Sequence, residues 1–313
     1  MVRLQEIQNP LFMGKLKYYV KSARLRTLPL SLAGIITGTG LAVSNYFVKW
    51  EVAVLVALTA CLLQILSNVS NEYGDNILGT DREDRQGPKY SDGHLTGTDF
   101  KRMIVFYSIA SCISGLAMIW CAYGTFLKLE PIMLIILGGF AVMAAIRYTV
   151  GRNPYGYRGL GDISVFMFFG LATVLGSYFI LAGEIPSAYL LLPASAIGFF
   201  SVGVLNINNI RDMETDAQTR TTVAIRLGET WAKIYQTMLI VGGWAMLLGY
   251  VFGCRLFTPW YLLCLCPLPV FIAHLVGLWR HSGKELDRYL PMLVMGTFFL
   301  SICIAVSFTI YLW

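Results

Sequence analysis

Charged residues are scarce in this chain. Only 13% of its 313 residues are Asp, Glu, Lys or Arg, and 56% are hydrophobic, whereas a soluble globular protein carries about a quarter charged residues. This composition excludes an ordinary soluble enzyme and gives no reason to expect a nucleic-acid partner. It indicates a protein that crosses the lipid bilayer several times.

Histidine is also rare, and cysteine forms no paired motif. The three histidines, His94, His274 and His281, are scattered along the chain, so neither a haem site nor a histidine-based metal site is predicted. The seven cysteines fall mostly in or beside apolar segments and include no Cys-x-x-Cys pair. Small buried hydrophobic side chains are therefore a better interpretation than disulfides or zinc ligands. No cleavable signal peptide is evident, because the first apolar run begins only near Thr27 and is long enough to span.

Nine apolar runs are long enough to cross a membrane as helices, which takes about 20 residues each. Their approximate limits are 27–46, 52–71, 102–124, 131–149, 162–182, 187–209, 231–253, 259–279 and 290–312. We therefore predict an all-α membrane protein in which residues 1–313 form one domain. The N-terminal segment 1–26 is expected to lie along the membrane interface, because it mixes Leu, Phe and Tyr with lysines.

The basic residues predict the orientation of these spans. Of the 24 Lys and Arg, 21 lie in the N-terminal segment or beside the connections after spans two, four, six and eight. The other side holds Lys49, Lys128 and Arg255. Because cytoplasmic loops are enriched in Lys and Arg, the N-terminus is expected in the cytoplasm. The two aspartate-rich loops, 72–101 and 210–230, are expected to face the cytoplasm as well.

Two polar motifs recur at the ends of the second and sixth spans. Asn71–Asp75 and Asn208–Asp212 both read Asn-x-x-x-Asp, and a further aspartate follows each of them, Asp81 and Asp216 respectively. Residues four apart on a helix share one face, so each motif can offer a carboxylate and an amide oxygen to one point. Such ligands suit Mg²⁺, which typically takes one or two protein carboxylates together with substrate phosphates. The two motifs predict a diphosphate held between metal ions at the membrane surface.

Solvated loops, whose acids balance neighbouring arginines, are the alternative interpretation of these motifs. That interpretation accounts for Glu83, Asp84 and Glu214. It does not account for amides embedded in apolar sequence near a helix end, which are costly without partners. Four such amides favour the metal site: Asn68, Asn71, Asn208 and Asn209.

A third polar segment, 147–162, is rich in glycine and tyrosine and carries three arginines. Arg147 or Arg152 could neutralise a leaving diphosphate, because guanidinium forks suit phosphate oxygens. Anchoring the cytoplasmic side is an equally good interpretation of each arginine, and the same choice applies to Arg24. Together the three segments suggest ionisation of an allylic diphosphate. Metal ions would accept the leaving charge, and apolar surroundings would keep water from the carbocation.

With these motifs the sequence resembles the UbiA superfamily of intramembrane prenyltransferases over nearly the whole chain. The stretches Asn71–Asp75 and Asn206–Asp212 carry the resemblance to the superfamily. The Tyr/Gly segment 148–162 and the run Asn-Ile-Asn-Asn-Ile-Arg-Asp are similar to the branch that acts on 1,4-dihydroxy-2-naphthoate.

The resemblance implies a nine-helix bundle around a central cavity, in the inner (plasma) membrane of a bacterium. It implies transfer of a polyprenyl group from polyprenyl diphosphate to 1,4-dihydroxy-2-naphthoate, with loss of CO₂ and diphosphate, giving demethylmenaquinone. The implied cofactor is Mg²⁺, and no obligatory protein partner is expected. Asn71, Asp75, Asp81, Asn208, Asp212 and Asp216 are the implied ligands of the metal and the diphosphate. The residues expected beside the substrates are Arg147, Tyr148, Arg152, Asn209 and Arg24.

Three features differ from the family pattern. Glu72 stands where an aspartate is usual, Arg152 precedes Asn153, and the loop after Asp216 is one residue shorter, with Arg220 as the candidate replacement for a lysine. Prenyl transfer to another acceptor, 4-hydroxybenzoate or haem, is the alternative function, although the naphthoate-type segment argues against it. A cation-coupled transporter is a third possibility, but its acids should lie near the bilayer midplane on broken helices.

Overall fold

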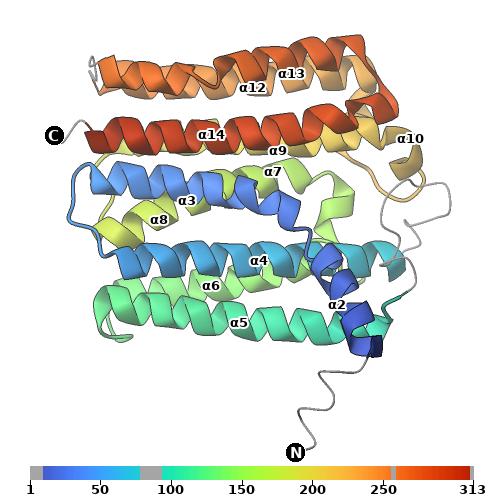
Figure 1. Cartoon of the computed structure of the whole chain (residues 1–313), viewed down its shortest axis with the longest axis horizontal. Helices are drawn as coiled ribbons and strands as arrows, with labels where there is room; N and C mark the ends of the chain where they lie inside the picture. The colour runs from blue at the N-terminus through green and yellow to red at the C-terminus, as the bar shows by residue number, and fades with distance from the viewer. Residues whose placement is uncertain (1–9, 78–93, 255–258, 311–313) are drawn as a thin grey trace, which may run out of the picture.

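The computed structural model describes residues 10–77, 94–254 and 259–310, with side chains from residue 15 onward. The elements within these ranges are helical (Figure 1), and nine of them are long and apolar enough to cross a membrane. The spans are Lys15–Val43, Trp50–Ile77, Gly97–Tyr123, Leu129–Arg147, Gly161–Ala182, Ala188–Arg211, Glu229–Gly253, Pro259–Arg280 and Gly283–Ile310. The predicted all-α fold and the nine predicted spans are confirmed.

Several spans consist of more than one helical element. The elements used below are α2 (Pro10–Ser22), α3 (Leu28–Val43), α4 (Trp50–Ile77), α5 (Gly97–Tyr123), α6 (Leu129–Arg147), α7 (Gly161–Val165), η4 (Phe166–Ala172), α8 (Thr173–Ala182), α9 (Leu191–Arg211), α10 (Met213–Asp216), α11 (Val223–Leu227), α12 (Glu229–Gly253), α13 (Leu268–Arg280) and α14 (Tyr289–Ile310). The element η4 is a stretch of π-helix between α7 and α8.

Two helices continue past the apolar runs from which they were predicted. The helix α4 extends to Ile77 and α9 extends to Arg211, so the polar motifs lie in or directly after the last turns of spanning helices. The first turn of α5 is fixed by a capping box, in which Thr96 and Asp99 bond each other's backbone N–H groups. Hydrophobicity predicted the middle of each helix, whereas polar side chains determine where it ends.

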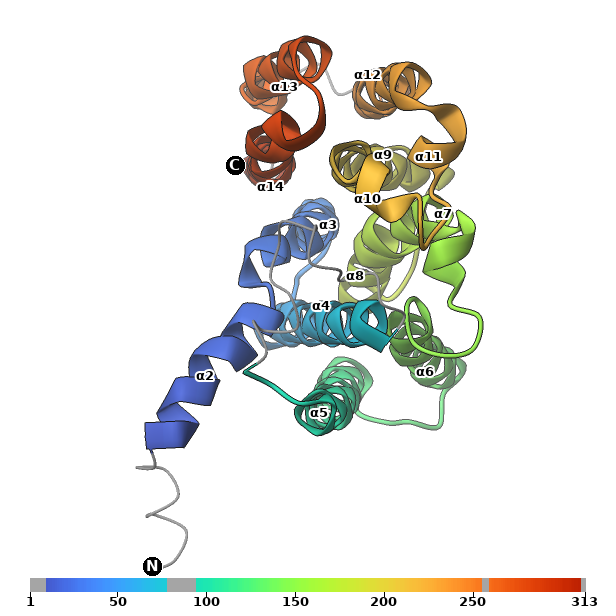
Figure 2. The same ribbon diagram turned by 90° about the vertical axis from the view of Figure 1, so that its right-hand side faces the viewer.

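The helices form a closed bundle in which neighbours along the chain are mostly neighbours in space (Figure 2). The helix α4 packs on α5 and α6, α9 packs on α12 and η4, and the last helix, α14, returns to pack on α3. A large apolar core joins α3, α8, α9 and α14, and its fully buried members include Leu41, Ile197, Phe200 and Leu300.

Small residues bring α3 unusually close to its neighbours. A Cβ atom at Gly34 would lie 1.9 Å from the Thr173 Oγ1, and one at Gly40 would lie 2.4 Å from the Ala305 Cα. Such close approach is typical of helix packing in membranes, where van der Waals contact replaces the hydrophobic drive of water. The packing leaves α3 as the helix that joins the N-terminal and C-terminal parts of the bundle.

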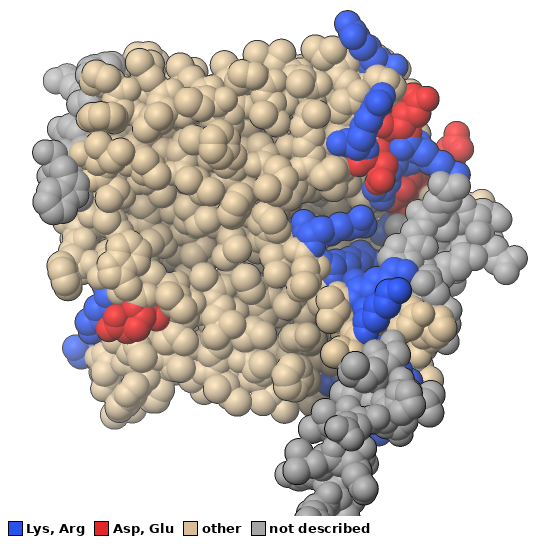
Figure 3. Space-filling view, viewed as in Figure 1, with Lys and Arg blue, Asp and Glu red and all other residues tan. Residues whose placement is uncertain are grey.

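The polar motifs and α2 share one end of the bundle. The C-terminal end of α4, α10 and α2 lie at this end, and the C-terminus lies at the opposite end (Figure 1). Lys and Arg side chains gather at the same end on the face drawn in Figure 3. The chain bends between α2 and α3 at Arg24, whose φ of 48° is left-handed, and α2 runs across the end of α4 (Figure 1).

Candidate functional site

The first motif lies on the last turns of α4 and is fixed by the chain that follows α6. The Thr149 hydroxyl donates to the Ser70 carbonyl oxygen at 2.9 Å and to the Asn71 Oδ1 at 3.1 Å. Gly74 makes this contact possible, because a Cβ there would lie 2.5 Å from the Thr149 carbonyl oxygen. Asp75, one turn after Asn71, is buried with 5% of its surface exposed.

The second motif lies at the end of α9 and is held by an arginine within it. The Arg211 guanidinium donates to both carboxylate oxygens of Asp212, at 2.9 and 2.6 Å, and to the Asn208 Oδ1 at 2.9 Å. Its third nitrogen pairs with Asp287 at 2.6 Å. The amide and carboxylate oxygens of this motif therefore meet at one cation, which supports the geometric argument that they can serve one point.

A tyrosine and an arginine join the first motif to the loop that follows the second motif. The Tyr157 hydroxyl, from the segment between α6 and α7, donates to Asp75. The Arg220 Nη2 donates to the Asp216 Oδ1 at 2.8 Å, and the same guanidinium lies over the Tyr157 ring, 5.6 Å from its centroid. The backbone N–H of Thr221 donates to the Tyr157 carbonyl oxygen at 3.0 Å. The first motif, the Tyr/Gly segment and the second loop thus form one connected polar site.

The charge of Arg220 is balanced by Asp75 of the first motif and by Asp216, which follows the second motif. Burial alone would lower the pKa of this guanidinium, but Asp75 and Asp216 hold the pKa above its ordinary value. The Asp216 side chain is 2% exposed and that of Arg220 is 14% exposed, so water screens their attraction only weakly. Arg220 is the cation that neutralises this part of the site.

Tyr148 lies within the same electrostatic environment. Burial raises the pKa of its hydroxyl, Arg220 opposes that shift, and the carboxylates of Asp162 and Asp75 add to it. The ring of Tyr148 also packs edge-on against Tyr155, with centroids 5.3 Å apart. The structure thus places Tyr148 beside the residues that connect the two motifs.

The other predicted site residues differ in their surroundings. Arg147 and Arg152 are exposed, at and beyond the end of α6, while Arg24 is half-buried at the bend after α2. Asn209 is buried at 5% exposure on α9. Asp81 and the rest of the first loop from 78 to 93 lie outside the described residues.

Oxygen is the ligand type that the site offers to a metal ion. Within the described ranges, no group of three or more His, Cys, Asp or Glu side chains could hold a metal ion. The oxygens that the two motifs offer are carboxylates and amides. Mg²⁺ uses such oxygen ligands when substrate phosphates complete its coordination. The donor set fits a metal ion that is shared with a diphosphate.

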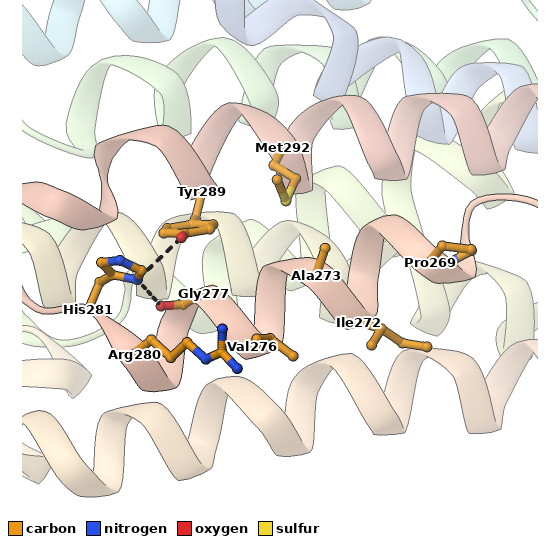
Figure 4. A pocket seen from close by; sticks show the side chains of 9 residues that line it. All are labelled: Pro269, Ile272, Ala273, Val276, Gly277, Arg280, His281, Tyr289 and Met292. Atoms are coloured by element: carbon orange, nitrogen blue, oxygen red, sulfur yellow. Dashed lines mark hydrogen bonds between the residues drawn. The ribbon is translucent and has the colours of Figure 1, made fainter.

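A separate pocket of about 510 Å³ lies between α13 and α14 (Figure 4). Its wall is mainly apolar, and at one end the His281 Nδ1 lies 2.9 Å from the Gly277 carbonyl oxygen and 3.2 Å from the Tyr289 hydroxyl. None of the residues that line it belongs to the two motifs. It is distinct from the candidate site.

Comparison with known proteins identifies the family. Residues 31–309 match the UbiA prenyltransferase family. The chain belongs to this family. It is 41% identical, over 86% of both chains, to 1,4-dihydroxy-2-naphthoate octaprenyltransferase of Escherichia coli (strain K12), and 36% identical to the protein of the same name in Haemophilus influenzae, covering 95% of this chain and 97% of that one. The solved apo structure of a UbiA homolog from Aeropyrum pernix K1 matches the fold with a TM-score of 0.69 at 15% identity, covering 93% of this chain and 99% of that chain.

In this UbiA family member, the sequence motifs indicated the site but not the residues that connect it. Tyr157 has no predicted role of its own within the Tyr/Gly segment, and Arg220 is predicted only as a candidate replacement for a lysine. Arg211 and Thr149 were not assigned to the site at all. The pattern carried one usable signal, since Arg211 lies within the second Asn-x-x-x-Asp motif, directly before its aspartate.

Proposed function

We propose that this UbiA family protein transfers a polyprenyl group from polyprenyl diphosphate to 1,4-dihydroxy-2-naphthoate, with release of CO₂ and diphosphate, giving demethylmenaquinone. The connection of the first Asn-x-x-x-Asp motif, through Tyr157 and Arg220, to Asp216 in the loop after the second motif carries this proposal. It supplies one polar site at the end of an apolar bundle, which a donor with a diphosphate head and a long apolar tail requires. The identity of 41% to the E. coli naphthoate octaprenyltransferase supports the choice of acceptor.

We place Mg²⁺ at this site. The residues that would hold the metal are Asn71, Asp75, Asp81, Asn208, Asp212 and Asp216. When bound, the metal would neutralise charge that develops on the departing diphosphate. The donor set of carboxylate and amide oxygens is the observation that supports magnesium over a softer metal.

The chain's own residues bind and orient the diphosphate in this proposal. Arg220 lies beside Asp75 and Asp216, and Arg147 and Arg152 lie on the exposed chain at and beyond the end of α6. Guanidinium groups bind phosphate oxygens with two donors at once. Asn209, Arg24 and Tyr148 complete the proposed contacts with the two substrates. The apolar helices around the site keep water from the allylic cation.

We infer that the site faces the cytoplasm of a bacterial inner membrane. Of the 24 Lys and Arg residues, 21 lie in the N-terminal segment or beside the connections after spans two, four, six and eight. Such residues are enriched on the cytoplasmic side of a membrane. In this orientation the N-terminal helix α2 would lie along the cytoplasmic interface, where its lysines can reach lipid headgroups.

A product assay tests the proposal. Membranes containing the protein are incubated with 1,4-dihydroxy-2-naphthoate, a polyprenyl diphosphate and Mg²⁺, and the products are identified by mass spectrometry. A prenylated, decarboxylated naphthoquinone that disappears with EDTA is the expected result. If product formed only with 4-hydroxybenzoate, that compound would replace 1,4-dihydroxy-2-naphthoate as the assigned acceptor. If no aromatic acceptor gave product, the proposed function would be wrong.

A further inference from the structure

Asp162 is a buried carboxylate that the diphosphate site does not use. It is 8% exposed and lies at the start of α7, immediately before an apolar stretch. The Tyr235 hydroxyl of α12 donates to its Oδ2 at 3.0 Å. Within the described part of the chain, no Lys or Arg forms an ion pair with Asp162. A carboxylate in such surroundings is costly to bury, so its place beside the site calls for a function.

The position of Asp162 relative to Tyr148 brings it to the edge of the site. The residue before it is Gly161, where a Cβ would lie 2.8 Å from the Tyr148 Oη. The Tyr148 hydroxyl interacts electrostatically with both Asp162 and Arg220. Asp162 therefore lies beside Tyr148 on α7 and is bonded from α12, whereas the described candidate metal and diphosphate ligands lie on α4, on α9, on α10 and at the turn between α9 and α10.

The partners of Asp162 differ from those of the acids in and after the second motif. Arg211 pairs with Asp212 and Arg220 pairs with Asp216, so each of these acids has a cation beside it. Asp162 is matched only by a neutral phenol among the described side chains, which leaves a hydrogen-bond acceptor suited to a neutral O–H donor. An aromatic acceptor with a ring hydroxyl supplies that donor.

We propose that Asp162, held by Tyr235, binds the ring hydroxyl next to the attacked carbon of the acceptor and accepts its proton. The proposal rests on the function proposed above. The C–O bond between the prenyl C1 and the diphosphate breaks, and its electron pair leaves with the diphosphate. The ring carbon then forms a bond to the prenyl C1 of the allylic cation. The hydroxyl proton passes to Asp162, and the hydroxyl oxygen becomes a carbonyl.

The second half of the step restores the enzyme. Loss of CO₂ from the alkylated carbon returns an electron pair to the ring, and the carbonyl oxygen becomes an enolate. Asp162 gives its proton back to that oxygen, which yields the hydroquinone form of the product. One proton leaves and one returns, so the step needs no oxidant and no external base. Tyr235 orients the carboxylate in both directions of transfer and is a positioning residue.

The test uses the full chain in lipid nanodiscs with 1,4-dihydroxy-2-naphthoate, a polyprenyl diphosphate and Mg²⁺. Asp162→Ala is expected to lower kcat by about 10²–10⁴-fold, the usual contribution of a general base, while the KM for the donor stays within about threefold. Added formate is expected to restore part of the rate of this variant without affecting the wild type, which a merely structural role would not produce. Tyr235→Phe is expected to lower kcat by about tenfold through loss of one hydrogen bond to a charged group.

Two further variants keep the outcome clear. Tyr250→Phe removes the hydroxyl of another tyrosine on α12, at its opposite end, and is expected to behave as the wild type. Asp162→Asn keeps the shape of the side chain and serves if Asp162→Ala does not fold. An active wild type with either Asp162 variant within about threefold of its kcat would overturn this proposal alone, as would an inactive Asp162→Ala that formate does not rescue. A folded wild type without product from this acceptor would overturn the proposed function first.

Discussion

Arg220 is the residue whose replacement tests the connected site most directly. It pairs with Asp216 at 2.8 Å, is attracted to Asp75, and lies over the Tyr157 ring. We predict that Arg220→Ala lowers both the stability of the metal-free protein and the efficiency of prenyl transfer. The stability loss arises because two buried carboxylates lose the cation that neutralises them.

The magnitude follows from the geometry of the pair. Two unit charges about 4 Å apart attract by about 4 kcal/mol at an effective dielectric constant of about 20. Removing one partner of a buried ion pair lowers the free energy of unfolding by about 3–5 kcal/mol, a range that includes this Coulomb energy. Water that enters the vacated space reduces the loss, so we expect about 3 kcal/mol. A change of 1 kcal/mol shifts the unfolding midpoint by about 2 °C in a chain of this size, which predicts a fall of about 6 °C.

Thermal unfolding in detergent measures this loss with a dye that reacts with thiols. The seven cysteines are free, and Cys264 and Cys303 are buried, so both become reactive on unfolding. Arg226→Ala is the matched control, because Arg226 lies six residues further on, in α11, is exposed, and donates to the Arg158 carbonyl oxygen at 3.3 Å.

Magnesium distinguishes the proposed role of Arg220 from a simple packing role. Without the arginine, Mg²⁺ can bind the released carboxylates directly, so it is expected to raise the midpoint of Arg220→Ala more than that of the wild type. A midpoint within 1 °C of the wild type, or an equal response to Mg²⁺ in both proteins, would refute the reasoning. Arg220→Lys should retain most of the stability, but less of kcat/KM for the donor, because an ammonium lacks the two-donor fork.

Further predictions concern the motifs and their supports. Asp75→Asn or Asp212→Asn should abolish prenyl transfer, measured by mass spectrometry, while membrane insertion is unchanged. Tyr157→Phe should lower kcat/KM for the donor by about tenfold, the effect of losing one hydrogen bond to a charged group. Steady-state kinetics measure this ratio, and a clearly smaller decrease would contradict a role for the Tyr157–Asp75 hydrogen bond in donor binding. Asn206→Ala removes the donor to Gln236 and should cost about 1–3 kcal/mol in the unfolding assay, with the substrate KM values unchanged; altered KM values would assign Asn206 to the site instead.

The fold could be predicted because the bilayer sets the length of each apolar run. Hydrophobicity cannot predict the helix ends, where polar residues decide. The predicted second span stopped at residue 71, yet α4 continues to Ile77. Its last turns remain helical because their polar groups bond to Thr149 and Tyr157, in the segment that follows α6, instead of to water. The bend at Arg24 is likewise invisible to hydropathy, because a left-handed φ at a residue other than glycine depends on tertiary contacts.

The ligand motifs could be predicted because the Asn and Asp of Asn-x-x-x-Asp, four residues apart, lie on the same face of a helix. The connection between the motifs could not, because it joins residues 82 positions apart in one case, Tyr157 and Asp75. No sequence pattern predicts the buried series of hydrogen bonds from Asn206 through Gln236 to His274 either. A lone histidine in an apolar segment predicts no particular partner, whereas the packing of α9, α12 and α13 gives it one.

The two arginine forks suggest how the site can be stable both empty and loaded. In the structure, Arg211 holds Asn208 and Asp212, and Arg220 holds Asp216. A metal ion that took up the lone pairs now used by the guanidinium groups would displace those groups from the oxygens. The diphosphate that arrives with the metal carries the negative oxygens that the displaced forks need. Substrate binding would then exchange partners instead of creating unpaired charge, which keeps the cost of reorganising a buried polar site low.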